Sequence, residues 1–142
     1  TAQQVFEEKK KAGKGTSFET PWRDIGYNFG IELVNDDYII RVGRPLNITA
    51  SHAVGYNNTH IGICVLGDFD KEAPSARVLE VLKALILKLQ SLYPKIKKET
   101  IITHWETFVL RKLVATKELA WSKYKSCPGK KFDLKYFLTN IM

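Results

Sequence analysis

The sequence predicts an α/β protein: a central mixed β-sheet flanked by helices, formed by a single domain over residues 1–142. Two observations predict this class. The near-continuous apolar segment Thr59–Leu66 is typical of a strand that is buried on both faces of a sheet. Residues 75–92 carry leucine, isoleucine and valine at three- and four-residue spacings, which predicts an amphipathic helix.

Before the apolar strand, the local patterns predict a helix, a loop and two strands. The second strand follows the first through a short polar turn, as in a hairpin, although the turn lacks glycine. The expected elements are a helix over residues 2–12, a loop over 13–21, strands over 26–34 and 38–42, and the turn at 35–37.

After the apolar strand, Pro94 is expected to end the helix over residues 75–92. Residues 99–104 predict a short strand that ends at His104. Residues 107–121 are basic and amphipathic and predict a further helix, and residues 132–139 predict the last one.

Composition narrows the classes of partner. The net charge is +7, so attraction to polyanions is expected. No basic cluster has the aromatic spacing of a base-stacking platform, so a specific nucleic-acid partner is not predicted. No apolar run approaches the roughly 18 residues of a membrane span, and residues 1–20 do not resemble a signal peptide.

The cysteines and histidines are the candidate chemical groups. Cys64 lies in the apolar strand and is expected to be a small core residue. Cys127 lies in a polar turn beside Lys125, which favours a thiolate that acts as a ligand or a reactive group. His104 and Cys127 together offer two good zinc ligands, but a catalytic zinc site takes three protein ligands, so this pair alone does not define a site.

Four segments, taken together, resemble the N-acetylmuramoyl-L-alanine amidase family, which includes phage amidase-type lysozymes and peptidoglycan recognition proteins. They are Trp22–Phe29 (WRDIGYNF), His52–Ile63 (HAVGYNNTHIGI), Ile102–Glu106 (ITHWE) and Lys125–Asp133 (KSCPGKKFD). The four follow the order found in the family and cover nearly the whole chain.

The resemblance implies a Zn²⁺ ion bound by two histidines and a cysteine, with a metal-activated water. His104 and Cys127 match the second and third ligands of the family. The first ligand, a histidine, is expected upstream of Thr1, at the end of a strand that this sequence lacks. Either His52 or His60 could replace it only if the fold placed that residue at the metal.

The resemblance also implies roles for four further residues. Tyr27 matches a tyrosine beside the zinc that helps to hold the water or the developing oxyanion, and Lys125 matches a lysine that stabilises the tetrahedral intermediate. His52 matches a histidine that lines the substrate groove, and Asn57 is expected to shape the adjacent loop.

These matches lead to a principal hypothesis and two alternatives. The principal one is zinc-dependent hydrolysis of the amide between N-acetylmuramic acid and L-alanine in peptidoglycan. The alternatives are a non-catalytic peptidoglycan-binding recognition module and a regulatory interaction protein. The expected partners are peptidoglycan and muropeptides. The protein is expected to be a monomer that is made in the cytoplasm and reaches the bacterial cell wall by phage-type release or by secretion.

The segment 107–121 is longer than the corresponding segment in compact phage members of the family and is interpreted as an insertion. It is expected to be either a helix packed on the domain surface or a rim that shapes the substrate groove.

Overall fold

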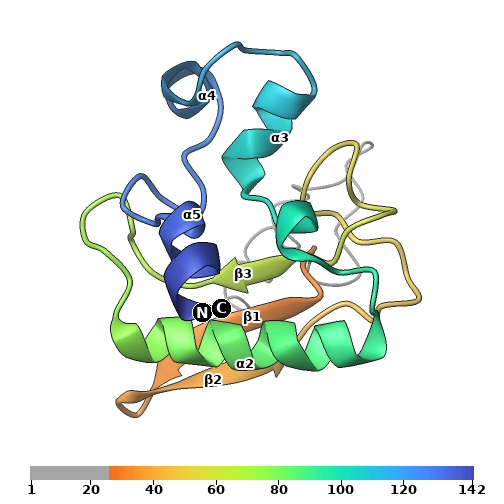
Figure 1. Ribbon diagram of the computed structural model, residues 1–142, viewed down its shortest axis with the longest axis vertical. Helices are drawn as coiled ribbons and strands as arrows, with labels where there is room; N and C mark the ends of the chain where they lie inside the picture. The colour runs from red at the N-terminus through yellow and green to blue at the C-terminus, as the bar shows by residue number, and fades with distance from the viewer. Residues whose placement is uncertain (1–25) are drawn as a thin grey trace, which may run out of the picture. The chain divides into compact units, whose positions relative to one another are not determined.

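The computed structural model of the chain describes residues 26–142. The chain divides into two compact units, Thr1–Leu66 and Gly67–Met142. The predicted helix over residues 2–12 and the predicted loop over 13–21 lie outside the described residues. Within the described residues, the first unit contains the β-strands and the second contains the helices (Figure 1).

The three strands of the first unit form a mixed sheet in the order β2–β1–β3. Strand β1 (Phe29–Val34) pairs antiparallel with β2 (Asp37–Val42) and parallel with β3 (Ile63–Val65) (Figure 1). Ile31 of β1 lies opposite residues of both neighbouring strands and is fully buried. The mixed sheet and the α/β class predicted from the sequence are therefore confirmed.

The hairpin between β1 and β2 turns through two residues, Asn35 and Asp36. Val34 pairs with Asp37, and the two turn residues have φ angles of 51° and 65°. Asparagine and aspartate tolerate this left-handed region better than other non-glycine residues, which explains how the turn forms without glycine. The predicted turn is confirmed, although β1 begins at Phe29 rather than at residue 26.

The prediction for the apolar strand was wrong in length and in burial. Strand β3 contains only Ile63–Val65, and all three residues are partly exposed, including Cys64, which was expected in the core. The residues before it form a turn, in which the amides of Thr59 and His60 both donate to the carbonyl of Tyr56, at 3.2 and 2.9 Å. These amides are therefore not available for pairing in a sheet.

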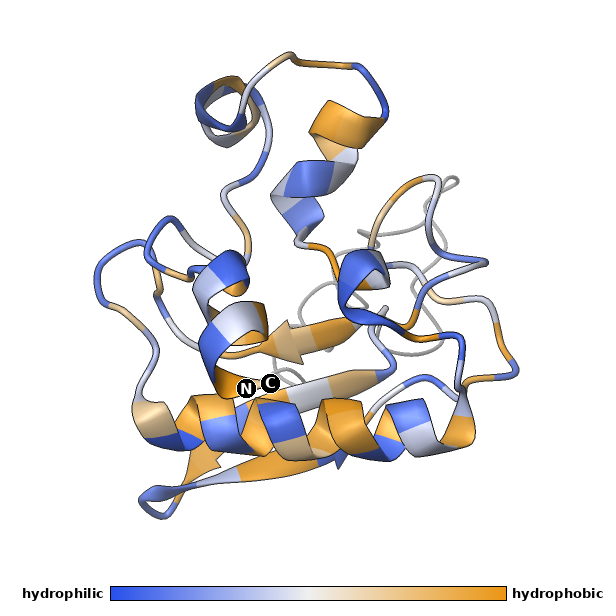
Figure 2. Ribbon diagram, viewed as in Figure 1, coloured by the Kyte–Doolittle hydropathy of each residue, from blue (hydrophilic) through white to orange (hydrophobic). Residues whose placement is uncertain are grey.

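Helix α2 (Ala76–Leu92) matches its prediction closely. The hydroxyl of Ser75 accepts a hydrogen bond from the amide of Val78 at 3.2 Å and caps the first turn. Six apolar side chains on one face are buried, and each contributes roughly 1.5–3 kcal/mol: Val78, Val81, Leu82, Leu85, Ile86 and Leu89. Figure 2 shows apolar and polar residues alternating along this helix.

The strand predicted over residues 99–104 is absent. The chain there forms a short 3₁₀ helix, η1 (Lys98–Thr100), and His104 begins helix α3 (His104–Leu110) instead of ending a strand. A capping box causes this change: the amide of Thr103 donates to Glu106 Oε2 at 2.6 Å, and the amide of Glu106 donates to Thr103 Oγ1 at 3.3 Å.

The single helix predicted over residues 107–121 is also wrong. Helix α3 ends at Leu110, and a separate helix, α4 (Lys117–Lys123), begins after a turn. In that turn Lys112 adopts a φ of 60°, and its amide donates to the carbonyl of Val109 at 2.9 Å. The hydroxyl of Thr116 then caps α4 by accepting from the amide of Leu119 at 3.2 Å.

The last predicted helix begins later than expected and is irregular. Asp133 Oδ1 accepts from the amide of Tyr136 at 2.9 Å and caps α5 (Leu134–Tyr136). The chain continues as a π-helical segment, η2 (Phe137–Ile141), which contacts α2 and contains the buried Phe137. Among the helices of residues 26–142, none is long and apolar enough to cross a membrane.

Candidate functional site

The six residues singled out by the sequence divide equally between the two units. The first unit contains Tyr27, His52 and Asn57, and the second contains His104, Lys125 and Cys127. Each group is described within its own unit.

In the first unit, Asn57 organises the loop that carries His52. Its side-chain oxygen accepts hydrogen bonds from the amides of His52 and Ala53, both at 2.8 Å. Because one carboxamide binds two successive amides, it fixes the backbone on which the His52 side chain stands.

The His52 ring is held on three sides. It stacks against the ring of Tyr27, with centroids 6.0 Å apart, and its Nε2 lies 3.0 Å from the carbonyl oxygen of His60. Gly62 forms the third contact, because a Cβ atom at this position would overlap Cγ of the His52 ring at 2.6 Å. The neutral ring with a proton on Nε2 satisfies this arrangement by donating to the His60 carbonyl.

Asn28 also organises this region, and the sequence analysis did not identify it. Its Oδ1 accepts from the amide of Gly62 at 2.9 Å, and its Nδ2 donates to the carbonyl of Arg44 at 3.0 Å. The residue is buried, so these bonds offset the cost of burying its amide. Its place beside Tyr27 in the first family-like segment was the one available signal.

Burial lowers the pKa of His52 from its usual value of 6.5, because desolvation disfavours the charged ring. The hydrogen bond to the His60 carbonyl opposes this shift, whereas the nearby His60 and Arg44 reinforce it. The structure therefore favours the neutral form of His52.

We expect an NMR titration of the imidazole carbons to give His52 a pKa below about 6.5, the value for an unfolded chain. Since the folded pKa is the lower one, the stabilising contribution of neutral His52 is complete above pH 6.5. It is lost as the pH falls from there through the folded pKa. The free energy of unfolding, measured with urea at several pH values, should therefore fall less in His52→Gln than in the parent chain as the pH is lowered from 6.5. A His52 pKa at or above 6.5 would contradict this prediction.

In the second unit, the backbone brings the segments of His104 and Cys127 together. The amide of Trp105, the residue after His104, donates to the carbonyl of Cys127 at 3.2 Å. The ring of His104 stacks on that of Phe108, with centroids 5.5 Å apart, and Phe108 stacks on Tyr124 at 4.5 Å. His104 is thus the first residue of α3 and the first ring of an aromatic row that leads to the end of α4.

Asp70, a residue that the sequence patterns did not single out, stabilises the loop around Cys127 through two hydrogen bonds. Asp70 Oδ2 accepts from the hydroxyl of Ser126 at 2.9 Å, and Oδ1 accepts from the amide of Lys130 at 2.8 Å. The amide of Lys131 also donates to the carbonyl of Phe69 at 2.8 Å. One carboxylate therefore holds the chain on both sides of Cys127.

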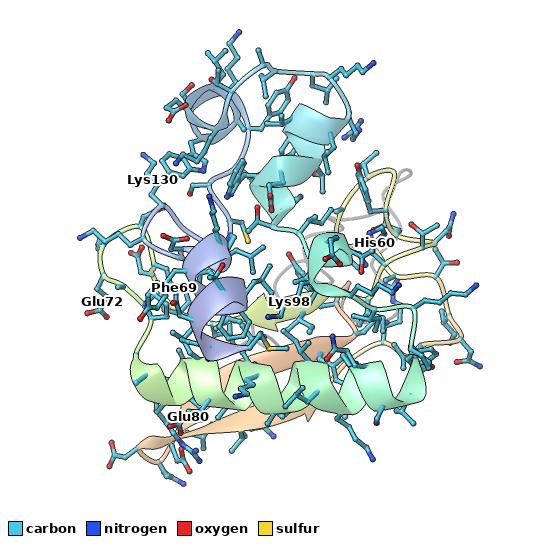
Figure 3. The ribbon with its side chains drawn as sticks, in the orientation of Figure 1. His60, Phe69, Glu72, Glu80, Lys98 and Lys130 are labelled. Carbon is cyan, nitrogen blue, oxygen red and sulfur yellow. The ribbon has the colours of Figure 1, made fainter. Side chains whose placement is uncertain are left out.

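Gly129 permits this close approach. Its φ is +132°, and a Cβ atom there would lie 2.5 Å from the carbonyl carbon of Phe69. The Phe69 side chain meets Phe132 edge-to-face at 5.8 Å, next to the C-terminal helical segment (Figure 3). Any other residue at 129 would push the Cys127 loop away from residues 69–70.

The expectation that nearby lysines favour a Cys127 thiolate was wrong for the protein without metal. Cys127 has exposed surface, but protein atoms surround it closely, and this desolvation raises the pKa of its thiol. Lys125 lowers the pKa and Asp70 raises it, but both effects are smaller than that of desolvation. A bound cation would supply the positive charge that a thiolate needs here.

The donor set at this place fits part of a zinc site. His104 and Cys127 offer an imidazole and a thiol on two hydrogen-bonded segments. Within residues 26–142, no three histidine, cysteine, aspartate or glutamate residues form a group that could hold a metal ion. The pair therefore suits a catalytic zinc site only if a further ligand is added.

Comparisons with known proteins identify the family. The family model described as N-acetylmuramoyl-L-alanine amidase matches residues 1–130. The endolysin of Enterobacteria phage K11 is 31% identical over an alignment of 116 positions, and the match covers 73% of this chain and 73% of the endolysin. Peptidoglycan-recognition protein LB of Drosophila melanogaster is 41% identical over 68 residues, 48% of this chain but only 28% of that protein.

A solved structure agrees with this assignment. The N-acetylmuramoyl-L-alanine amidase LysC from Clostridium intestinale URNW superposes with a TM-score of 0.64 at 27% identity, covering 99% of this chain and 75% of LysC. The chain therefore belongs to the N-acetylmuramoyl-L-alanine amidase family.

Proposed function

We propose that this protein hydrolyses the amide between N-acetylmuramic acid and L-alanine in peptidoglycan, using a zinc ion bound by His104 and Cys127. The hydrogen bond from the Trp105 amide to the Cys127 carbonyl carries this proposal, because it joins the two segments that would supply the metal ligands. Membership of the amidase family supports the choice of substrate.

The third ligand in this proposal is a histidine that precedes Thr1 in a longer chain. Zinc, when bound, lowers the pKa of a coordinated water to about 7 and polarises the substrate carbonyl. The capping box of Thr103 fixes the start of α3 and therefore the backbone of His104. Asp70 fixes the Cys127 loop in the same way.

The remaining roles belong to side chains that bind and orient the substrate. Lys125 donates to the oxyanion that forms on the carbonyl oxygen when water attacks the carbonyl carbon, and the Tyr27 hydroxyl helps to hold the attacking water or this oxyanion. His52, in a loop fastened by Asn57, lines the groove for the muropeptide. The net charge of +7 holds the protein near the anionic wall.

The proposed setting follows from the same assignment. The chain forms one amidase domain in which residues 107–121 are an insertion. It acts as a monomer, is made in the cytoplasm, and reaches the wall by phage-type release or by secretion.

Replacing Lys125 by alanine should lower kcat by about 10²–10³-fold, because one donor to the oxyanion is lost. Bound zinc should not change. The measurement is the release of stem peptides from purified peptidoglycan, followed by mass spectrometry. Lys123→Ala is the matched control: it removes an exposed lysine two residues away, in the last turn of α4, and should retain full activity. Equal activity in the two variants would remove Lys125 from the mechanism.

A direct test separates the enzyme from the recognition module. The full-length protein is dialysed, its zinc content is measured, and it is then incubated with peptidoglycan. Bound zinc together with released stem peptides supports the enzyme. Muropeptide binding without release at any zinc concentration supports the recognition module, a function that relatives such as peptidoglycan-recognition protein LB make reasonable.

A further inference from the structure

A cavity lies wholly within the unit Gly67–Met142. It has a volume of about 900 Å³, and residues of η1, α3, α4 and the C-terminal helical segment line it. Neither His104 nor Cys127 is among the lining residues. The volume is within the roughly 300–1,000 Å³ that is usual for ligand-binding pockets.

Two tryptophans form an aromatic corner in this cavity. Trp105 comes from α3 and Trp121 from α4, and their rings meet edge-to-face with centroids 6.2 Å apart and planes at 85°. Both residues are partly exposed. Such a corner can receive the apolar face of a sugar ring against one indole and its edge against the other.

Lysines surround this corner. The ammonium groups of Lys117 and Lys130 lie 4.9 and 5.9 Å from the centre of the Trp121 ring. Lys98 and Lys135 also line the cavity, and Figure 3 labels Lys98 and Lys130. Within residues 26–142, none of these four lysines forms a salt bridge. No ion pair within this range neutralises their charges, so they can attract a negatively charged ligand, although Lys117 and Lys130 also interact with the Trp121 ring.

Three carboxylates moderate this positive charge. Glu99, Glu106 and Asp133 line the same cavity, so that four lysines face three acids. Two of the acids are committed to helix caps: Glu106 accepts from Thr103, and Asp133 accepts from the amide of Tyr136. A densely charged polyphosphate would meet repulsion from these acids, whereas a sugar polymer offers them hydroxyl donors and carries fewer charges.

We propose that this cavity binds a glycan whose sugars carry carboxylates. The structure leaves the indole N–H of Trp121 buried without an acceptor among the described residues, so a sugar oxygen that reached it would complete its hydrogen bonding. A carboxylate-bearing glycan is also what the proposed reaction leaves behind. Hydrolysis of the muramoyl amide places a free carboxylate on the lactyl group and an amine on the alanine. On this point alone the inference rests on the proposed function.

Isothermal titration calorimetry on the full-length protein tests the inference with four probes. They are peptide-free glycan strands from peptidoglycan, an oligosaccharide rich in uronic acid, a neutral N-acetylglucosamine oligomer, and single-stranded DNA. We expect tightest binding of a carboxylate-bearing probe, and the better of the first two identifies the source of the glycan. Tighter binding of the DNA, or equal binding of the neutral oligomer, would overturn the proposal.

Variants locate the binding. The double variant Lys117→Gln/Lys130→Gln should weaken binding of the carboxylate-bearing glycan by about 3- to 10-fold, as expected for two exposed charge contacts. Binding of the neutral oligomer should change little. The matched control, Lys88→Gln/Lys123→Gln, removes two exposed lysines outside the cavity and should leave the affinity unchanged.

A third variant tests the role of the indole N–H. Trp121→Phe retains an aromatic ring but removes the indole N–H, and it should also weaken binding of the carboxylate-bearing glycan. Circular dichroism verifies that each variant folds. Equal affinity in all of them would disprove the site.

A metal-free arm separates this inference from the enzymatic proposal. Chelator-treated protein should bind the glycan as tightly as the untreated protein, because no proposed metal ligand lines the cavity. If stem peptides are never released but binding still depends on Lys117 and Lys130, the enzymatic proposal fails and the cavity assignment stands. If the stem peptides are released but the lysine variants bind normally, the cavity assignment fails alone.

Discussion

Replacing Cys127 by serine should abolish both tight zinc binding and amidase activity in the full-length protein. Serine is similar in size but is a poor zinc ligand, so one of the three proposed ligands is lost. Removal of a residue that only supports a ligand typically lowers metal affinity 10- to 100-fold. Loss of the ligand itself should therefore lower zinc affinity by at least about 100-fold. Competition with a chromophoric chelator measures the affinity, and mass spectrometry of digested peptidoglycan measures the activity.

The chain contains its own control for this experiment. Cys64 is the other cysteine of the sequence; it lies in β3 of the first unit and is half-buried. Cys64→Ser makes the same chemical change in the first unit, at a residue that is not a proposed ligand, and should retain zinc. A Cys127→Ser protein that still binds zinc tightly and releases stem peptides would refute the metal-centre proposal. Similar losses in both variants would instead indicate general destabilisation.

Replacing Asp70 by alanine should weaken zinc binding by about 10- to 100-fold without removing any ligand. The Asp70 carboxylate accepts hydrogen bonds from Ser126 at 2.9 Å and from the amide of Lys130 at 2.8 Å, on either side of Cys127. Without these bonds the loop can adopt other conformations, and zinc binding must then restrict it. Asp70→Asn retains one carbonyl acceptor and an amide that can donate to Ser126, so it should lose less affinity than Asp70→Ala.

The readout for Asp70 must distinguish positioning from simple loss of stability. The absorption spectrum of the cobalt-substituted protein reports the geometry around the metal, and we expect it to change in Asp70→Ala and to recover in Asp70→Asn. Asp68→Ala is the matched control, because Asp68 lies in the same loop, and its side chain makes an exposed ion pair with Lys71 at 3.6 Å. An unchanged cobalt spectrum and zinc affinity in Asp70→Ala would show that Asp70 has no part in positioning Cys127.

Local signals in the sequence predicted some elements well and were overlooked for others. Helix α2 follows its apolar spacing, and Asn35 and Asp36 form the expected turn. The spacing of Thr103 and Glu106 is that of a capping box and could have predicted the start of helix α3, but the apolar residues before His104 were interpreted as a strand. The break between α3 and α4 had no comparable signal. It requires Lys112 at a φ of 60°, and neither glycine nor proline marks the position.

Sequence patterns were sufficient to predict the α/β class, the family-like order of the motifs and the residue types of the proposed site. How Cys127 is held depends on tertiary packing, and so does the finding that burial, rather than Lys125, has the larger effect on the pKa of its thiol. The bonds from Asp70 to Ser126 and Lys130 span 56 and 60 positions of the chain. Periodicity and capping act over a few residues, because they reflect the geometry of one turn or one strand. A carboxylate that meets its partners this far along the chain is placed by the packing of the whole unit, which no local pattern records.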